Sequence, residues 1–97
     1  MPVEFLNHLK AVIRERKNAS PESSYTAKLF SRGTHKIAQK VGEEAVELVI
    51  EALSDNDELF KNEAADLLFH YLLLLENRGI DLDEIIAVLE ERHSGKK

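Results

Sequence analysis

The sequence predicts an all-α fold, a helical bundle with a central antiparallel hairpin of two long helices. Apolar residues recur with the period of an amphipathic helix along most of the chain, and no segment alternates polar and apolar residues as a strand does. Capping residues and glycines separate the helical segments from one another. The 97 residues are 43% apolar and 32% charged, which suits a single domain, residues 1–97, with one core.

The N-terminal third is expected to hold two helices of unequal length. The first spans residues 3–17, where one face is apolar and basic residues lie at the C-terminal end, as the helix dipole favours. The segment NASPESSYT is rich in turn residues and predicts a loop. A short helix follows over residues 26–32 and is closed by Gly33.

Two long helices are expected in the middle of the chain. Residues 35–53 form the first, with Thr34 as its N-cap. Residues 57–78 form the second, opened by a capping pair of Asp55 and Glu58. The connection SDNDE between them is short, so the two helices must run antiparallel.

The end of the chain carries a second set of boundary signals. Gly79 stops the second long helix. Asp81 and Glu84 repeat the capping pair and predict a last helix over residues 82–93. The tail SGKK is expected to fray.

Composition excludes several classes of function. The chain has a formal net charge of −5 and no cysteine, which argues against a general nucleic-acid binder and rules out disulfides, zinc–thiolate sites and a thiol nucleophile. The N-terminal segment is too polar for a signal peptide, and no apolar run approaches the ~18 residues of a membrane span. A cytoplasmic location is therefore expected. The first 42 residues are nevertheless net positive, so a small polyanion remains a feasible ligand.

Charged residues gather on one side of the first long helix, around the segment KVGEEAVE. Placed at helical spacing, they fall within one sector: Lys36, Lys40, Glu43, Glu44, Glu47 and Glu51. Taken alone, this pattern also fits an ordinary solvated face, with Lys40 and Glu44 as a weak helix pair.

The second long helix changes that interpretation. Its segment LLFHYLLLL, residues 67–75, is apolar around almost the whole circumference, and a helix with this pattern is expected to be buried. Glu63, Asp66 and His70 share one narrow sector of the same helix. The carboxylates of Glu63 and Asp66 are therefore expected to point towards the protein interior.

Four carboxylates are expected to converge, Glu44 and Glu47 from the first long helix and Glu63 and Asp66 from the second. Buried carboxylates repel one another unless a cation or a proton intervenes. Shared protons, Lys or Arg partners, or a divalent metal would each relieve the repulsion. All-oxygen ligands of high negative charge favour Mg²⁺ or Mn²⁺ over zinc, and Mg²⁺ keeps positions open for phosphate oxygens. The pattern therefore favours a metal site for a phosphorylated ligand over a structural polar network.

Four segments of the sequence resemble one known family. They are SPESSYTAKLF, GTHKIAQKVGEEAVELVIEAL, NEAADLLFHYLLLL and GIDLDEIIAVLEER. The family is phosphoribosyl-ATP pyrophosphohydrolase of histidine biosynthesis, within the MazG-like superfamily of all-α nucleotide pyrophosphohydrolases, and the resemblance covers essentially the whole chain. The ExxE and ExxD acids match the superfamily, whereas SYT, KVGEEA and ADLLFH resemble the narrower histidine-pathway branch.

The resemblance implies an activity and an assembly. The activity is hydrolysis of phosphoribosyl-ATP between its α- and β-phosphates to phosphoribosyl-AMP and pyrophosphate, the second step of histidine biosynthesis. The chain is too short to include the cyclohydrolase of the next step, so a stand-alone form is expected. The family also implies a homodimer with active sites near the subunit interface, which would cover the leucine-rich segment. No nucleic-acid or membrane partner is expected.

The resemblance also implies roles for the acids. Glu44, Glu47, Glu63 and Asp66 are the expected Mg²⁺ ligands, with Glu43 beside them. Metal ions would bridge phosphate oxygens and activate the attacking water. A carboxylate that metal does not saturate, Glu43 or Glu47, is the expected catalytic base, and the sequence does not choose between them.

Basic residues near the acids are the candidates for phosphate contacts. They are Lys28, Arg32, Lys36 and Lys40. Tyr25, in the SYT segment, is the candidate for binding the ribose or the adenine. An ordinary surface role, or for Tyr25 a core role, is the alternative in each case. His70 lies one turn after Asp66, and we expect it to orient that carboxylate through a hydrogen bond rather than to bind metal directly.

Three other interpretations remain open. A housekeeping pyrophosphohydrolase for free nucleotides would use the same acids, and turnover of phosphoribosyl-ATP against dCTP or dUTP separates the two. A carboxylate-bridged di-iron protein needs two inward Glu-x-x-His pairs, and only Glu90 to His93 has that spacing. An acidic interaction module without enzymatic activity predicts that Mg²⁺ leaves thermal stability unchanged.

Overall fold

The computed structural model describes residues 2–96, and within this range the chain forms helices and turns without a β-strand. The all-α prediction is therefore confirmed. The helices are α1 (Pro2–Arg16), α2 (Tyr25–Arg32), α3 (Thr34–Ala52), α4 (Asp57–Asn77) and α5 (Leu82–Glu91), with a 3₁₀ turn η1 (Pro21–Ser23) before α2 and a π-helical turn η2 (Arg92–Lys96) after α5. None of these helices combines the length and the apolar character that crossing a membrane requires.

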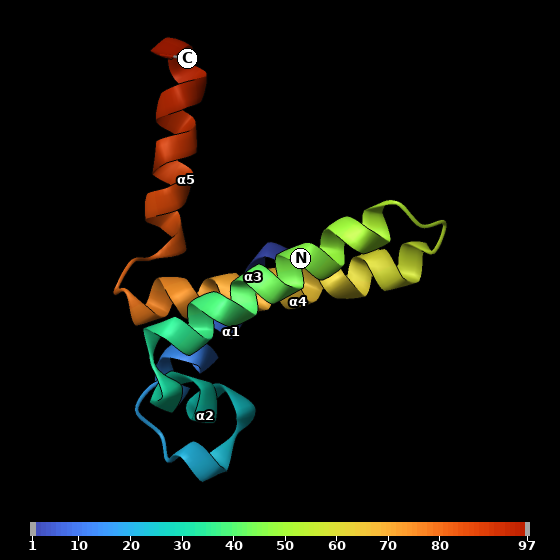
Figure 1. The fold of residues 1–97 in the computed structure, drawn as a ribbon. Helices are drawn as coiled ribbons and strands as arrows, with labels where there is room; N and C mark the ends of the chain where they lie inside the picture. Colours follow the sequence, from blue (N-terminus) through green and yellow to red (C-terminus); the bar gives the residue numbers. More distant parts are fainter. Residues whose placement is uncertain (1, 97) are drawn as a thin grey trace.

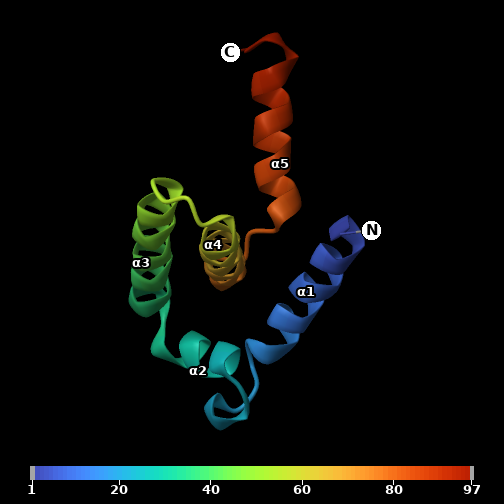
Figure 2. The ribbon, with the colours of Figure 1, turned by 90° about the vertical axis from the view of Figure 1, so that its right-hand side faces the viewer.

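Helix α4 lies at the centre of the arrangement. Figure 2 shows α4 nearly end-on, with α3 on one side, α1 on the other and α2 across the end of the group. Helices α3 and α4 run side by side in opposite directions along most of their length (Figure 1). Helix α5 stands away from the other helices in both views.

The core forms where α1 and α2 pack against the first half of α3 and the second half of α4. Its buried apolar side chains are Ile13, Leu29, Phe30, Ile37, Leu72 and Leu73. Ile37 and Leu73 are fully buried. The core therefore holds α2 against one end of the α3–α4 pair, and the farther halves of α3 and α4 extend beyond it.

The start of α3 differs from the expectation. Thr34 was expected to cap the helix, but Gly33 is the N-cap and also ends α2. A single residue makes this sharp turn with φ of 90°, a conformation that glycine adopts without steric cost. Thr34 is instead the first residue of α3, and its hydroxyl accepts a hydrogen bond of 2.6 Å from the Asn77 side chain.

The start of α4 also differs, by one residue. The expected capping residue Asp55 is followed by Asn56, whose side-chain oxygen accepts a hydrogen bond of 3.0 Å from the Leu59 amide. Asn and Asp cap helices about equally well, so the sequence could not rank these neighbours. At α5, by contrast, the predicted capping box between Asp81 and Glu84 is confirmed.

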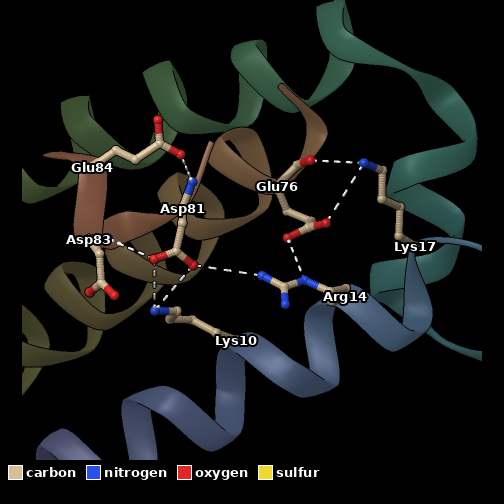
Figure 3. A network of polar contacts seen from close by, with 7 residues as sticks. All are labelled: Lys10, Arg14, Lys17, Glu76, Asp81, Asp83 and Glu84. Carbon is tan, nitrogen blue, oxygen red and sulfur yellow. Dashed lines mark hydrogen bonds and ion pairs between the residues drawn. The ribbon is translucent and has the colours of Figure 1, made fainter. Parts of the chain in front are cut away.

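A network of ion pairs ties the turn between α4 and α5 to α1 (Figure 3). The Asp81 carboxylate lies 3.4 Å from Lys10 Nζ and 3.6 Å from Arg14 Nη2. The Glu76 carboxylate lies 3.4 Å from Arg14 Nε and 3.8 Å from Lys17 Nζ. The same aspartate therefore caps α5 and anchors it to α1.

The leucine-rich segment of α4 is only partly covered. We expected this helix to be buried once a homodimer forms; in the single chain Leu68 is 46% exposed. One side of α3 is also apolar and open to solvent, with exposed side chains at Val46, Val49, Ile50 and Leu53. The single chain therefore leaves part of this apolar surface open, and its burial in a homodimer stays a prediction.

Candidate active site

Three of the four predicted metal ligands meet between α3 and α4. Carboxylate oxygens of Glu44, Glu63 and Asp66 all lie within 4.8 Å of one another. Glu44 is buried, Glu63 is half-buried and Asp66 is exposed. The cluster therefore has a closed side towards the helices and an open side towards solvent.

Helix geometry accounts for this convergence. Glu63 and Asp66 are three residues apart on α4, so their side chains leave the helix on the same face. That face lies against α3, which runs in the opposite direction and presents Glu44 at this level. We call these three residues the acidic cluster.

Two oxygens of the acidic cluster are buried without a partner among the described residues. They are Glu44 Oε1 and Glu63 Oε1. A buried carboxylate oxygen that accepts no hydrogen bond is unfavourable by more than a typical hydrogen bond contributes. The two oxygens are therefore available to a cation, and hard all-oxygen donor sets of this kind suit Mg²⁺ or Mn²⁺.

The electrostatics of Glu63 agree with this interpretation. A hydrogen bond with Glu47, burial, and the nearby charges of Glu47, Asp66 and Glu44 raise the pKa of the Glu63 carboxyl from 4.5 to about 7. The group is therefore about half protonated at neutral pH when no cation is bound. A divalent cation would replace that proton and neutralise the same repulsion.

The two predicted catalytic carboxylates lie in different places. Glu47, the fourth predicted ligand, lies beside Glu63 at the edge of the acidic cluster, where it is the largest cause of the raised pKa of Glu63. Glu43 lies outside the cluster and lines the pocket described below; it accepts a hydrogen bond of 2.7 Å from Gln39 and lies 3.4 Å from Lys40 Nζ. The hydrogen bonds from Gln39 and Lys40 lower the pKa of Glu43, so Glu43 is a weaker base than an ordinary glutamate.

A pocket of about 250 Å³ opens between α2 and α3 beside the acidic cluster. It is lined by Tyr25, Lys28, Leu29, Arg32, Lys36, Lys40 and Glu43. All five residues predicted to bind substrate thus line one pocket, which we call the cationic pocket.

Sequence reasoning missed Leu29 and Gln39. Leu29 forms part of the pocket wall although most of its side chain is in the core. Tyr25, Lys28, Leu29 and Arg32 have the i, i+3, i+4, i+7 spacing of one helix face, which could have predicted its place. Gln39 precedes Glu43 by four residues, and that spacing allows the hydrogen bond observed.

Lys40 joins the pocket to the acidic cluster. Its Nζ lies 3.4 Å from Glu43 Oε1 and 3.5 Å from Glu44 Oε2. Desolvation lowers the pKa of this lysine, but the hydrogen bond to Glu43 and the surrounding negative charges outweigh it, so the net shift is upward. Lys40 is therefore a positive charge at neutral pH, shared between two carboxylates.

Tyr25 and His70 form a second link between the pocket and the cluster. His70 Nδ1 lies 2.7 Å from the backbone carbonyl oxygen of Asp66, and its Nε2 lies 2.7 Å from the Tyr25 hydroxyl. A carbonyl oxygen only accepts, so Nδ1 donates; in the neutral ring Nε2 then accepts from Tyr25. Burial, the first of several causes, raises the pKa of Tyr25, which keeps the hydroxyl a donor.

The expected role of His70 therefore needs correction. We expected its ring to hydrogen-bond the Asp66 carboxylate, but the bond goes to the backbone carbonyl of that residue. His70 is 6% exposed, and its ring lies against its own helix, where the carbonyl four residues earlier is within reach. His70 holds the backbone of α4 at the acidic cluster and positions Tyr25.

The residues behind the di-iron alternative lie elsewhere. Glu90 and His93 are exposed on α5 and η2, which stand away from the α3–α4 pair. His8 and His35 are also exposed. Among the described residues, the acidic cluster is the one group of three or more potential metal-binding side chains within 4.8 Å.

Comparison with known proteins gives consistent results. The family model described as phosphoribosyl-ATP pyrophosphohydrolase matches residues 6–93. The chain is 52% identical over 87 residues to "Phosphoribosyl-ATP pyrophosphatase" of Erythrobacter litoralis, covering 90% of this chain and 84% of the relative. It is 50% identical over 92 residues to the protein of the same name from Zymomonas mobilis, covering 95% and 86%.

Longer relatives match as well. The chain is 53% identical over 89 residues to "Histidine biosynthesis bifunctional protein HisIE" of Shewanella oneidensis; the match covers 92% of this chain but 42% of the relative. The chain thus spans less than half the length of that bifunctional relative. A family model that covers nearly the whole chain, together with relatives about half identical to it, shows that the chain belongs to the phosphoribosyl-ATP pyrophosphohydrolase family.

Proposed function

We propose that this protein hydrolyses phosphoribosyl-ATP at the α–β phosphate bond, in a Mg²⁺-dependent reaction that yields phosphoribosyl-AMP and pyrophosphate. This is the second step of histidine biosynthesis. The observation that carries the proposal is the acidic cluster next to the cationic pocket, in a chain that belongs to this family. The acidic cluster suits divalent cations, and the cationic pocket suits phosphate groups.

Glu44, Glu63 and Asp66, with Glu47 at the edge of the cluster, would hold Mg²⁺ or Mn²⁺. The two unpartnered oxygens of Glu44 and Glu63 support this assignment. The bound cation would neutralise charge on the phosphates and lower the pKa of a coordinated water. The half-buried position of Glu63 and the buried position of Glu44 fix the donor oxygens in place.

Glu47 is the better candidate for the catalytic base. It lies at the edge of the acidic cluster beside Glu63, whereas Glu43 is held by Gln39 and Lys40 on the pocket side. In the proposed reaction one water is consumed and the bridging α–β P–O bond breaks. The oxygen of the water ends on the phosphorus atom that it attacks, the bridging oxygen stays with the other product, and a carboxylate such as Glu47 accepts the proton that the water loses.

Lys28, Arg32, Lys36 and Lys40 would neutralise the phosphate groups of the substrate. Glu43 contributes by holding Lys40 at the mouth of the pocket, through the contact of 3.4 Å. Tyr25, fixed by its 2.7 Å hydrogen bond with His70, would present its ring to the ribose or the adenine. His70 acts as a positioning residue through Tyr25 and the backbone of Asp66.

The same proposal includes a homodimer that completes the helical bundle around the α3–α4 pair. The exposed apolar side chains of α3 and the leucine-rich segment of α4 support it, because monomeric proteins rarely leave such surfaces open. A second copy is the partner that a self-complementary apolar face favours. A cytoplasmic location and the absence of nucleic-acid and membrane partners stay predictions from the sequence.

A substrate comparison tests the proposed function. Purified protein is incubated with phosphoribosyl-ATP, dCTP or dUTP, with and without Mg²⁺, and released pyrophosphate is measured. We expect phosphoribosyl-ATP to be turned over with a kcat/KM at least about 100-fold above those of the free nucleotides, since a specific site discriminates by several hydrogen bonds. Preference for dCTP or dUTP would favour the housekeeping alternative. An unchanged thermal stability on adding Mg²⁺, with no turnover, would favour the interaction module.

A further inference from the structure

The cationic pocket carries more positive charge than its own residues neutralise. Of its four cations, Lys40 is paired with Glu43 and Glu44 at 3.4 and 3.5 Å. No carboxylate of the described residues lies within 4.0 Å of the charged groups of Lys28, Arg32 or Lys36. Three cations around one small pocket repel one another, so the pocket favours a ligand with several negative charges.

The size of the pocket limits what it can hold. Its volume of about 250 Å³ is below the ~300–1,000 Å³ of sites that enclose a drug-sized ligand. The pocket is open to solvent, so it would enclose only part of a phosphoribosylated nucleotide, such as a pair of linked phosphate groups, while the rest lies outside. The pocket is therefore suited to one highly charged end of the substrate.

Phosphoribosyl-ATP has two charged ends, the triphosphate and the phosphate of the phosphoribosyl group. The position of the pocket indicates which of the two it binds. Lys40 belongs to its wall and also contacts Glu44 in the acidic cluster. Tyr25 belongs to the same wall and reaches the Asp66 backbone through His70. The pocket is thus contiguous with the place where the α–β bond would be cleaved.

Covalent connectivity then favours the pyrophosphate end. In phosphoribosyl-ATP the β-phosphate is joined directly to the α-phosphate, and the γ-phosphate follows the β-phosphate. The phosphate of the phosphoribosyl group, by contrast, is separated from the α-phosphate by a ribose, the purine and a second ribose. A pocket that shares its wall with the cleavage site is reached by the directly joined groups, and these also carry more charge than a phosphate monoester.

We propose that the cationic pocket is the subsite for the pyrophosphate leaving group, with Lys28, Arg32 and Lys36 holding the β- and γ-phosphates and Lys40 next to the bond that breaks. This assignment rests on the proposed function, because it takes the cleaved bond from it. It follows that inorganic pyrophosphate binds the free protein in this pocket and inhibits turnover by occupying it. The phosphoribosyl end lies outside the pocket.

Calorimetric titration with inorganic pyrophosphate tests the assignment without requiring activity. The titration is done in a chelating buffer, so that metal does not contribute, on wild type, on the double variant Lys28→Ala/Arg32→Ala, and on Lys61→Ala. Lys61 is an exposed lysine on α4 that lines no part of the pocket. The double variant is expected to bind pyrophosphate at least about tenfold more weakly, because two charge-assisted contacts are lost. Lys61→Ala is expected to bind it as wild type does.

Turnover measurements separate this assignment from the proposed function. In the double variant, the inhibition constant of pyrophosphate is expected to rise by the same factor, while the affinity for phosphoribosyl-AMP stays within about twofold of wild type. Unchanged pyrophosphate binding, or a loss confined to phosphoribosyl-AMP, would overturn the subsite even if wild type hydrolyses phosphoribosyl-ATP. Absence of pyrophosphate binding by wild type at millimolar concentration would also overturn it. Pyrophosphate binding as expected, with no turnover of phosphoribosyl-ATP by wild type, would instead contradict the proposed reaction.

Discussion

At the scale of single residues, the central feature is a carboxyl group with an unusual proton affinity. Glu63 lies half-buried beside Glu47, Glu44 and Asp66, and its pKa is raised from 4.5 to about 7. One of its oxygens is buried without a hydrogen-bond partner among the described residues. In the absence of metal, this residue makes the folded state less favourable than an uncharged side chain would.

The first prediction concerns the pH dependence of stability. Because the folded-state pKa of Glu63 is raised, the folded protein holds a proton that the unfolded chain has released once the pH exceeds 4.5. Stability without metal should therefore fall as pH rises from that value through about 7. In Glu63→Gln this decline should be smaller, and above neutral pH the variant should melt at a higher temperature than wild type. Thermal unfolding in chelating buffers across this pH range checks it.

The result that would contradict this prediction is a Glu63→Gln variant with the same pH profile as wild type. Glu58→Gln is a suitable control, since Glu58 is an exposed residue on α4 whose ion pair among the described residues is with Lys61, at 3.7 Å. It should leave the profile unchanged. Adding Mg²⁺ should stabilise wild type by mass action and should have little effect on Glu63→Gln.

The sequence predicted the convergence of three acids, Glu44, Glu63 and Asp66, but not the place of Glu47 at the edge or the orientation of the neighbouring side chains. Glu63 and Asp66 share a face because of their spacing, and a short connection must bring them opposite the preceding helix. Whether Glu43 faces the cluster or the pocket depends on the rotation of α3 about its axis, which packing sets. The His70 contact with a carbonyl, rather than with a carboxylate, also depends on how deeply its ring is buried.

At the scale of elements, the ends of the helices determine how the site is held. Helix α4 ends in a Schellman motif, in which the Ile80 amide donates to the Leu75 carbonyl at 2.9 Å and the Gly79 amide to the Glu76 carbonyl at 3.0 Å. Gly79 has φ of 72°, in the left-handed region that other residues adopt at a cost. This turn places Asp81 where it can cap α5 and contact α1.

The second prediction uses this glycine. Gly79→Ala should destabilise the protein by about 1–2 kcal/mol, because alanine is strained at a positive φ. Gly42→Ala is the matched control, since Gly42 lies inside α3 and no atom would lie within 4 Å of an added methyl group. That change should stabilise the protein by about 0.5–1 kcal/mol. Urea denaturation measures both, and effects of the same sign would contradict this explanation of the turn.

The third prediction concerns Asp81. Hydrogen bonding from the Asp83 amide and the nearby Lys10 and Arg14 lower the pKa of this carboxyl. Its contribution is therefore present above its ordinary value of 3.8 and is lost as pH falls through the lower folded-state value. Asp81→Asn keeps an N-cap acceptor but lacks the charge. We expect a lower melting temperature than wild type at neutral pH and convergence of the two at acidic pH; a constant difference would contradict the ion-pair role.

Element boundaries illustrate where sequence signals become ambiguous. The capping box at α5 was predictable because Asp81 and Glu84 provide both halves of a reciprocal pair. The starts of α3 and α4 were misplaced by one residue, because Gly33 and Thr34, or Asp55 and Asn56, are neighbouring residues that can each cap a helix. Which of two such neighbours becomes the N-cap depends on the backbone turn and not on the type of side chain.

At the scale of the whole molecule, the exposed apolar surface remains to be explained. The farther halves of α3 and α4 extend beyond the core, and α5 stands away from the other helices. Neither the direction of α5 nor the open side of α3 could be predicted from the sequence, because periodicity indicates which face is apolar but not what covers it. A second copy of the chain is our proposed cover.

The fourth prediction tests that assembly. Ile50, 58% exposed on α3, is replaced by Glu, which places a charge in the proposed interface. Ile50→Glu should halve the molar mass measured by light scattering, because an unpaired charge in an apolar interface is strongly unfavourable. Ala38→Glu, at an exposed position elsewhere on α3, should keep the mass of wild type. A monomeric wild-type protein would contradict the proposed dimer.

The fifth prediction, at the same scale, joins the acidic cluster to the proposed activity. Asp66→Asn preserves the size of the side chain and removes its charge from the cluster. The measurement is pyrophosphate release from phosphoribosyl-ATP by wild type and Asp66→Asn across a Mg²⁺ titration, with circular dichroism to check the helical content of both. We predict release by wild type only when Mg²⁺ is present, and a loss of more than about 100-fold in kcat/KM for the variant with its helices intact. Turnover by wild type without any divalent cation, or wild-type turnover by Asp66→Asn, would contradict a catalytic metal site at these acids.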